Sequence, residues 1–260
     1  MEKAVLFEVK KGVATITLNR PDRYNAVNQD LTDGISNYLK KCEVDDSIRA
    51  VVITGAGRGF CAGADMSVFG DDVTAEQRSQ YIIDEYQPLM NQFFSLKKPI
   101  IGAINGTAAG VGAAFALACD FRVMSDQSGI LYAFVNIGLG PDGGASWLLA
   151  RQVGYSRALE IATSGKKVTG QRCLELGLTN HIVPQDDILS NAQAWAEEFA
   201  LRPTLAIGIA KEDIFFAMDH SLNETIAFEA KKQIDALKSH DLKEGVAAFI
   251  EKRKPNFSGK

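Results

Sequence analysis

The sequence predicts a layered α/β fold followed by a helical C-terminal region. Over about the first 185 residues, short apolar segments with strand character alternate with helical patterns, as in parallel βαβ units. Beyond that point the apolar spacing is helical almost throughout. We therefore expect an α/β core over residues 1–190 and a helical region over residues 191–260.

Each element of the core has its own signal. Residues 4–9 and 13–18 alternate apolar and polar side chains around Lys10-Lys11-Gly12, which predicts a β-hairpin. The later elements are predicted in this order: a helix over 29–42, a buried strand over 50–53, a long helix over 75–96, a strand from Pro99, a small-residue helix over 108–118 and a strand over 121–124. Helical patterns then cover 188–200, 205–217, 222–238 and 243–253.

The composition is that of a globular protein. Of the 260 residues, 46% are hydrophobic and 23% charged, which excludes disordered and fibrous classes. The net charge of −4 argues against nucleic acid as a partner. Without a membrane-spanning run or a signal-peptide core, we expect a cytoplasmic protein that does not bind membranes. Four scattered cysteines are interpreted as reduced core thiols.

Two glycine-rich stretches follow predicted strands, at residues 59–65 and 105–112. Small residues allow a ligand or another backbone to approach closely, and a helix start leaves unpaired N–H groups at the positive end of its dipole. Two such loops facing each other could hold a developing oxyanion between two N–H donors. Tight turns and close helix–strand packing are the alternative use of these glycines.

The second stretch also fits the Gly-x-x-x-Gly-x-Gly fingerprint of short-chain dehydrogenases. That motif belongs to the first βα turn of a Rossmann unit, whereas here it lies beyond residue 100. None of the six tyrosines has a lysine four positions later, so the catalytic pair of that family is missing. A nicotinamide-dependent dehydrogenase is kept as an alternative from another class.

A third segment, Ile137 to Gly144, places the carboxylate of Asp142 among glycines ahead of a predicted apolar helix. Asp142 is either a helix N-cap or a catalytic acid or base whose pKa burial would raise. Other chemistries have little support. There is no Gly-x-Ser-x-Gly elbow, the three histidines lie in the C-terminal third, and no cluster has metal-ligand spacing.

Together these segments resemble the enoyl-CoA hydratase/isomerase (crotonase) superfamily over almost the entire chain. The likeness is carried by a series of motifs in register: Thr17-Leu18-Asn19-Arg20-Pro21 with Asn25-Ala26, Phe60 to Asp65, Asn105 to Gly112, Cys119-Asp120, Glu244 to Phe249 and Lys252 to Pro255. The resemblance implies a spiral of repeated ββα units with C-terminal helices that drive trimerisation, and hexamers built from two trimers are common. No separate cofactor is implied, because coenzyme A is part of the substrate.

The resemblance also implies roles for particular residues. Ala64 and Val111 match the two positions whose backbone N–H groups hold the thioester oxygen. The expected coenzyme A site comprises Arg23, Tyr24, Ala26, Ala62, Ala64, Asp65, Met66 and Lys254. Lys254 belongs to a basic tail that could meet phosphates across a subunit boundary or be simply solvated. Tyr132, Phe134 and Trp147 are expected to shape an apolar acyl pocket, with core packing as the alternative.

The chain departs from the hydratase pattern where hydratases carry two glutamates. Ala114 and Phe134 stand at those positions, and neither can take or give a proton. Asp142 instead matches the acid position of an isomerase branch that includes phenylacetate-type ring isomerases and Δ3,Δ2-enoyl-CoA isomerases. One carboxylate suffices to move a proton from C2 to C4, whereas hydration must also activate water. The sequence therefore predicts an isomerase, with hydration and non-catalytic acyl-CoA binding as alternatives.

Overall fold

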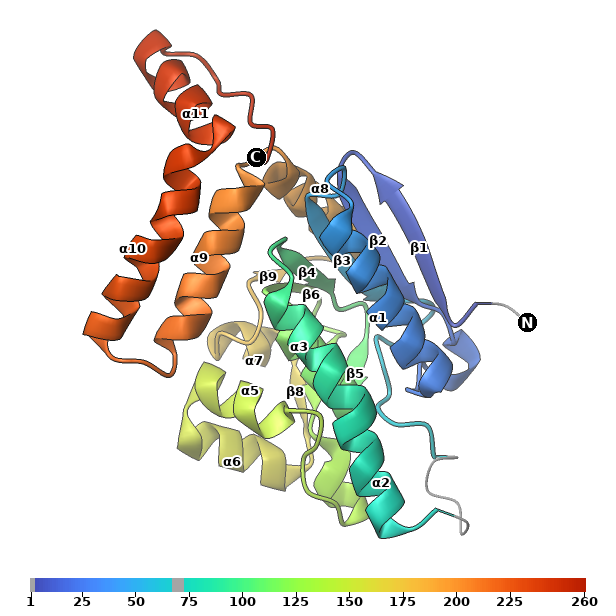
Figure 1. Cartoon of the computed structure of the whole chain (residues 1–260). Coiled ribbons are helices and arrows are strands. Elements are labelled where there is room, and N and C mark those ends of the chain that lie inside the picture. The colour runs from blue at the N-terminus through green and yellow to red at the C-terminus, as the bar shows by residue number, and fades with distance from the viewer. Residues whose placement is uncertain (1–2, 67–72) are drawn as a thin grey trace.

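The computed structural model describes residues 3–66 and 73–260. A six-stranded sheet lies at its centre, with strand order β1-β2-β3-β4-β6-β9 (Figure 1). Only β1 is antiparallel to its neighbour in this sheet, and the other pairs are parallel. The strands are β1 (Val5–Lys10), β2 (Val13–Leu18), β3 (Ala50–Gly55), β4 (Ile100–Ala103), β6 (Phe121–Met124) and β9 (His181–Ile182). The predicted hairpin and parallel βαβ units are confirmed.

A second, smaller sheet runs beside the first and joins β5 (Thr107–Ala109), β7 (Gly129–Leu131) and β8 (Lys167–Thr169). Isolated parallel bridges, Val27 to Ala64 and Cys61 to Ala108, extend this layer toward the N-terminus. Each turn of the chain thus passes through the large sheet, then through the second layer, then into a helix. This is the expected spiral of ββα units.

Helices cover both faces of the large sheet. The larger apolar core joins the sheet to α1 (Gln29–Val44), α3 (Gln87–Ser95), α4 (Val111–Ala118) and α5 (Ala145–Val153). On the opposite face, Ile188, Ala192, Ala196 and Ala200 of α8 (Ile188–Ala200) pack on Val52, Ile101 and neighbouring strand residues. Two further helices, α6 (Tyr155–Ser164) and α7 (Gly170–Glu175), lie beside the second sheet.

The predicted helix over 75–96 is present but changes register in the middle. It runs as α2 (Ala75–Tyr81), a π-helical segment (Ile82–Tyr86) and α3. The N–H of Gln87 donates to Ile82 O, five residues back. Pro88 has no N–H for the carbonyl four residues back, and its ring would clash with that carbonyl in a regular helix. The proline therefore accounts for the π-turn.

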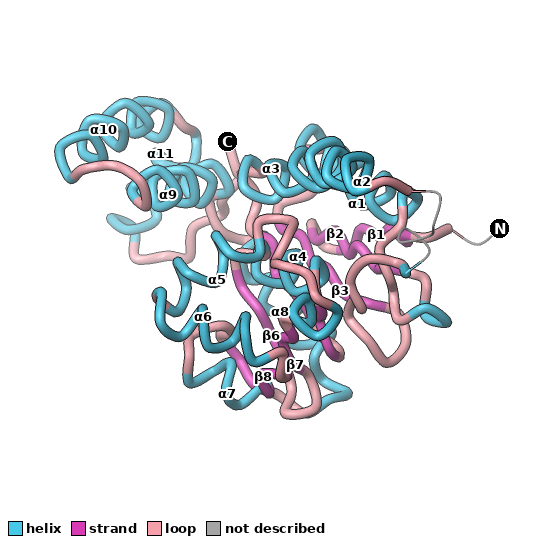
Figure 2. The backbone as a smooth tube through the Cα atoms, turned by 90° about the horizontal axis from the view of Figure 1, so that it is seen from below, coloured by secondary structure: helices cyan, strands magenta, loops and turns pink. Residues whose placement is uncertain are grey.

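Helices α9 (Thr204–Ala217), α10 (Leu222–Lys238) and α11 (His240–Glu251) stand to one side of the layers (Figures 1 and 2). The expected boundary at residue 190 falls inside α8, which packs on the sheet, so the separate helical region begins with α9. After α11 the tail folds back, and Asp241 accepts hydrogen bonds from the N–H groups of Ser258 and Gly259. Among the described helices, none combines the length and apolar character that a membrane span requires.

Candidate active site

The two glycine-rich loops meet side by side in the second layer. Cys61 O accepts a hydrogen bond from Ala109 N at 2.8 Å, and Cys61 N donates to Thr107 O. Gly63 has a φ of +92°, and a Cβ built on it would lie 3.5 Å from the Cα of Gly110. Glycine is required at this crossing because the backbone is left-handed and because the same Cβ would lie only 2.9 Å from Ala109 O.

The backbone pattern directs two N–H groups toward this crossing. The N–H of Val27 donates to Gly63 O, and Val27 O accepts from the N–H of Asp65. Ala64 lies between Gly63 and Asp65 in the chain, so its own N–H points away from Val27. Val111 is the first residue of α4, where a helix N–H has no intrahelical acceptor. Neither N–H donates to an acceptor among the described residues. Two donors in adjacent loops, one at the positive end of a helix, can stabilise an oxyanion.

The glycines of the dehydrogenase-like motif serve packing between these loops. A Cβ on Gly112 would lie 2.5 Å from Cys61 O, and one on Gly106 would overlap Arg58 O. Their open faces are filled by the protein's own backbone, so they offer no cradle for a pyrophosphate. The structure thus gives the dinucleotide alternative no support.

The loop that carries Asp142 packs directly against the start of α4. Gly143 has a φ of +60°, and a Cβ built on it would lie 2.8 Å from Cγ2 of Val111 and 3.6 Å from the Tyr86 ring. Asp142 itself is not a helix cap, since Gly144 occupies the N-cap position of α5. The fold therefore brings Asp142, Val111 and, through the Gly63–Gly110 crossing, Ala64 into one site.

The environment of Asp142 favours proton exchange. Its side chain is 19% exposed, and its Oδ1 atom is buried without a hydrogen-bond partner among the described residues. Burial raises the pKa of this carboxyl, and the charge of Arg78, whose Nη2 lies 3.9 Å from Oδ2, opposes that rise. A carboxylate with a free, desolvated oxygen can accept a proton from a bound molecule.

An alanine and a phenylalanine occupy the two positions, 114 and 134, at which hydratases carry glutamates. Ala114 is fully buried within α4. The Phe134 ring would lie 3.9 Å from a Cβ on Gly110 and makes an edge contact with Tyr132. Tyr132 is buried, and its hydroxyl donates to Ala145 O at the start of α5. Phe134 and Tyr132 thus form apolar walls beside the glycine crossing.

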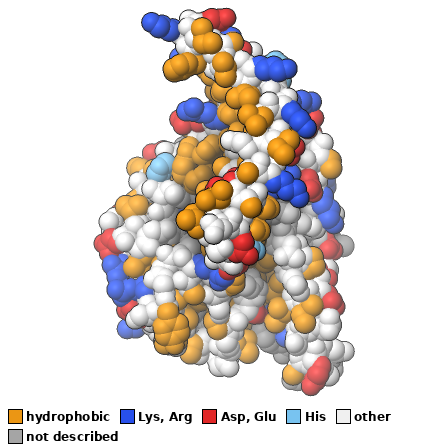
Figure 3. Space-filling model, turned by 60° about the vertical axis from the view of Figure 1, so that its left-hand side comes forward, with side chains coloured by type: hydrophobic (Ala, Val, Ile, Leu, Met, Phe, Trp, Pro, Cys, Tyr) orange, Lys and Arg blue, Asp and Glu red, His pale blue; other side chains and the backbone are white. Residues whose placement is uncertain are grey.

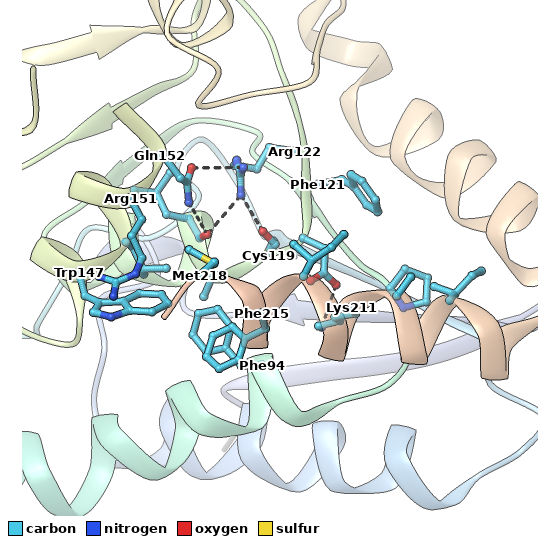
Figure 4. A pocket seen from close by; sticks show the side chains of 18 of the residues that line it. Phe94, Cys119, Phe121, Arg122, Trp147, Arg151, Gln152, Lys211, Phe215 and Met218 are labelled. Atoms are coloured by element: carbon cyan, nitrogen blue, oxygen red, sulfur yellow. Dashed lines mark hydrogen bonds and ion pairs between the residues drawn. The ribbon is translucent and has the colours of Figure 1, made fainter. Parts of the chain in front are cut away.

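Trp147 lies apart from these two rings. Its indole packs against Phe94 and Phe215, with the Arg151 guanidinium 4.0 Å above it. It lines a different cavity of about 580 Å³ beneath α9, at the C-terminal end of α4 (Figure 4). Within the described residues, the structure therefore does not group Trp147 with Tyr132 and Phe134.

Buried Asn25 connects two of the segments expected to bind coenzyme A. Its φ is +58°, and its amide Nδ2 donates to Ala56 O, Gly59 O and Phe60 O. Ala62 N donates to Tyr24 O, which joins the segments at a second point. The structure therefore brings residues 23–26 together with residues 62–66.

The surface of these segments is mixed. Arg23, Tyr24, Ala62 and Met66 are exposed, and Arg58 donates to the Tyr24 hydroxyl. Buried Ala26 accepts a hydrogen bond from Arg20, which also pairs with Asp65 at 2.9 Å. Lys254 follows α11 in the chain, and α11 lies at the opposite end of the molecule from α2, as Figures 1 and 2 both show. Within one chain Lys254 is not brought to the site.

Sequence reasoning missed Arg78 and Tyr86, which lie beside the Asp142 loop. Their helix was predicted, but not which of its side chains face the site. Pro88 was the signal that the helix changes its hydrogen-bonding register and so turns different side chains toward the site. No metal is expected at the site, and within residues 3–66 and 73–260 no group of three His, Cys, Asp or Glu side chains gathers that could hold one.

The spiral of ββα units, with two N–H groups, unpaired within the described residues, near a partly buried carboxylate, agrees with an enzyme of the enoyl-CoA hydratase/isomerase family. The profile described as enoyl-CoA hydratase/isomerase matches residues 8–260, so the chain belongs to this family. It is 38% identical to 1,2-epoxyphenylacetyl-CoA isomerase of Escherichia coli K12, with both chains fully covered. It is 35% identical to a probable enoyl-CoA hydratase of Rhodobacter capsulatus, with 98% of each covered. The crystal structure of an enoyl-CoA hydratase from Bacillus anthracis superposes with a TM-score of 0.93 at 30% identity, covering 99% of this chain and all of the other.

Proposed function

We propose that this protein is an acyl-CoA isomerase that moves a double bond by proton transfer through a thioester enolate. The observation that carries the proposal is the position of Asp142. It is a buried carboxylate with a free oxygen, in a loop that packs on the residue supplying one of the two N–H donors. Support also comes from Ala114 and Phe134, which replace the two glutamates that hydration uses.

The two donors lower the barrier to enolate formation. Removing a proton alpha to a thioester carbonyl places negative charge on its oxygen. The N–H groups of Ala64 and Val111 bind that charge more strongly in the enolate than in the ground state, since a charge-assisted hydrogen bond is the stronger one. Losing one such donor typically costs about 3–4 kcal/mol of transition-state stabilisation. Because both donors are main chain, valine at position 111 leaves this function intact.

Asp142 then acts first as base and afterwards as acid. As a carboxylate it takes a proton from C2 of a 3-enoyl thioester, and the electron pair moves onto the thioester oxygen. When the enolate collapses, the protonated Asp142 returns the proton to C4, and the double bond lies between C2 and C3. Atoms and charge balance without water or a cofactor. The same sequence of steps suits an aliphatic or a ring-containing acyl group.

The coenzyme A portion is proposed to lie along the joined segments 23–26 and 62–66. Exposed Arg23 and Arg58 offer charge to phosphates, and the Tyr24 ring offers a face for the adenine. The acyl group points inward toward the Phe134 and Tyr132 walls. The 1,2-epoxyphenylacetyl-CoA isomerase among the relatives supports a ring-containing acyl group as one of the substrates to test.

The decisive test is to supply a 3-enoyl-CoA in deuterated water and identify the products by mass. We expect the 2-enoyl isomer without a 3-hydroxy product. Replacing Asp142 with Asn is expected to lower kcat about 100- to 10,000-fold, the usual contribution of a general acid–base group. The control is Asp126→Asn, an exposed carboxylate in the loop before β7, which should leave the rate unchanged. Full activity in Asp142→Asn would refute the mechanism.

Hydration is the second candidate, because several relatives carry the name enoyl-CoA hydratase. It predicts rapid formation of 3-hydroxyacyl-CoA from a 2-enoyl-CoA, with Asp142 activating water. That product, formed faster than the double bond migrates, would replace isomerisation as the function.

We further propose that the C-terminal helices bind other copies of this chain, as a trimer or a dimer of trimers. Large apolar side chains gather on these helices and face outward (Figure 3). The exposed set comprises Leu222, Ile226, Ile234, Leu237, Leu242, Val246, Phe249 and Ile250. A face of this kind is typical of an interface. Sedimentation should show a trimer or hexamer, and Phe249→Asp, at a side chain 85% exposed, should shift it toward monomer.

A further inference from the structure

We propose that Arg78 is a positioning residue for Asp142, held in place by two tyrosines and delivered to the site by the π-turn in its helix. The proposal rests on the proposed function, because it assigns Arg78 a task in the same proton transfer. Arg78 lies on α2, outside the glycine loops and the Asp142 segment that carry the site.

The guanidinium is enclosed rather than solvated. The Arg78 side chain is 14% exposed, and its Nη2 atom lies 3.9 Å from Asp142 Oδ2 and 3.4 Å from the Tyr86 hydroxyl. The Tyr81 and Tyr86 rings lie 5.1 and 5.7 Å from its central carbon, within cation–π range. An arginine fixed on three sides supplies a charge of defined position, which a solvated side chain does not.

The π-turn explains how Arg78 and Tyr86 come to share a helix face. In a regular α-helix, residues eight apart differ in direction by about 80°, since each residue turns about 100°. A π-turn accommodates one extra residue in a turn. Residues eight apart across it are therefore oriented roughly like residues seven apart in a regular α-helix, whose side-chain directions differ by only about 20°. The side chains of Arg78 and Tyr86 then point the same way, toward the Asp142 loop. The Tyr86 ring would lie 3.6 Å from a Cβ built on Gly143, beside the acid.

The contact fixes one carboxylate oxygen and leaves the other available. Oδ2 faces Arg78, whereas buried Oδ1 has no hydrogen-bond partner among the described residues. At 3.9 Å the pair is an ion pair beyond hydrogen-bond length, so Arg78 orients the carboxylate without occupying its lone pairs. Oδ1 thus keeps its lone pairs free of hydrogen-bond donors from the described residues. Arg78 also favours the ionised form that must exist before C2 can be deprotonated.

Within residues 3–66 and 73–260, few charged or titratable groups face Asp142. Arg78 and Tyr86 approach from the helix, and the pKa of Tyr86 is raised to about 12, chiefly by burial. The pKa of Tyr81 beside them is also raised, again chiefly by burial. Both tyrosines therefore stay protonated at neutral pH, and Asp142, whose pKa burial raises, is the acidic group that Arg78 affects.

The test compares Arg78→Gln and Arg78→Lys with the control Arg157→Gln, which removes an equal charge from an exposed ion pair with Glu160. We expect Arg78→Gln to lower kcat for 3-enoyl-CoA by about 10- to 100-fold with little change in KM, as expected when an acid–base group is displaced by up to about 1 Å. Its loss should be greater at pH 6 than at pH 8.5, because the buried carboxyl then takes up a proton more readily. Arg78→Lys keeps the charge and should restore the pH profile of the wild type, although not all of kcat.

A second readout does not depend on turnover. In protein labelled with 13C at aspartate carboxyls, the Asp142 signal is identified by its loss in Asp142→Asn. We expect this signal to titrate at higher pH in Arg78→Gln than in the wild type or in Arg157→Gln. An unchanged titration, or a rise in KM with kcat preserved, would show that Arg78 binds substrate or serves folding alone. If the wild type does not isomerise 3-enoyl-CoA, the proposed function fails while the titration still decides the role of Arg78.

Discussion

Replacing Gly143 with alanine should displace Asp142, the proposed catalytic acid, without changing its side chain. The new Cβ would lie 2.8 Å from Cγ2 of Val111, whereas ordinary contacts begin at about 3.4 Å. The overlap is 3.4 − 2.8, or about 0.6 Å. Val111 begins a fully buried helix and has little room to retreat. We therefore expect the loop that carries Asp142 to move instead.

The size of the effect follows from this geometry. A misplacement of about 1 Å at a reacting group can cost about 100-fold in rate, so a shift of about 0.6 Å should lower kcat by roughly 10- to 50-fold. Alanine at a φ of +60° should also lower the free energy of unfolding by about 1–2 kcal/mol. The backbone penalty affects stability, and the steric overlap affects rate, so the two can be measured separately.

Two comparison variants isolate the steric overlap. Gly138→Ala, in the same segment, has a φ of +76° but nothing within 4 Å of its Cβ, so it should show the stability loss alone. Val111→Ala removes the opposing methyl group while keeping the N–H donor, so Gly143→Ala combined with it should recover most of the rate. The assays are urea unfolding and turnover of 3-enoyl-CoA. The reasoning fails if Gly143→Ala is no slower than Gly138→Ala, or if Val111→Ala gives no recovery.

Three further predictions concern the framework around the site. The buried guanidinium of Arg122 donates to carbonyls at the end of α4 and to Leu178 O. Replacing Arg122 with Met should therefore lower the free energy of unfolding in urea by roughly 3 kcal/mol, and a loss below about 0.5 kcal/mol would contradict this. Asn25→Ala leaves three carbonyls without their donor and should lower the free energy of unfolding by about 2–3 kcal/mol. It should also weaken coenzyme A binding measured by calorimetry. Unaltered binding would show that Asn25 does not support the ligand site. Burial raises the pKa of Asp241, but hydrogen bonds from Ser258 and Gly259 outweigh it and hold the pKa below its usual value. The tail should therefore be fully held above about pH 3.9 and loosen as the pH falls through the lower pKa of the folded state. The Gly259 amide signal reports this step, which should be absent in Asp241→Asn.

The sequence was sufficient for elements whose periodicity extends over many residues. The hairpin, α1, the buried strand β3 and the four C-terminal helices lie within a few residues of their predicted positions. Strands of two or three residues, such as β7, β8 and β9, were not predicted, because alternation cannot be recognised over so short a segment. For the same reason residues 108–109 were assigned to the helix that follows, although they belong to β5.

For the site, motifs identified the chain positions but not the contacts. The resemblance singled out Ala64, Val111 and Asp142, and the structure shows how Gly63, Gly110 and Gly143 allow their loops to meet. Arg78 carries no motif of its own. Its approach to Asp142 depends on the phase of a helix that Pro88 alters, which is a consequence of backbone hydrogen bonding rather than of residue type.

The spiral fold accounts for the separation between the proposed oxyanion site and the proposed proton-transfer group. Successive ββα turns deliver equivalent points of the chain to one place: Ala64 after β3, Val111 after β4 and β5, and Asp142 after β6 and β7. The first two contribute main-chain donors, which depend on backbone geometry and tolerate a change of side chain. The third contributes a side chain, on a loop whose position Val111 and Tyr86 restrict. On the proposed mechanism, a change of reaction requires only that the carboxylate move from one turn to another while the two N–H donors stay in place. Asp142, with Ala114 and Phe134 at the other two positions, fits such an arrangement.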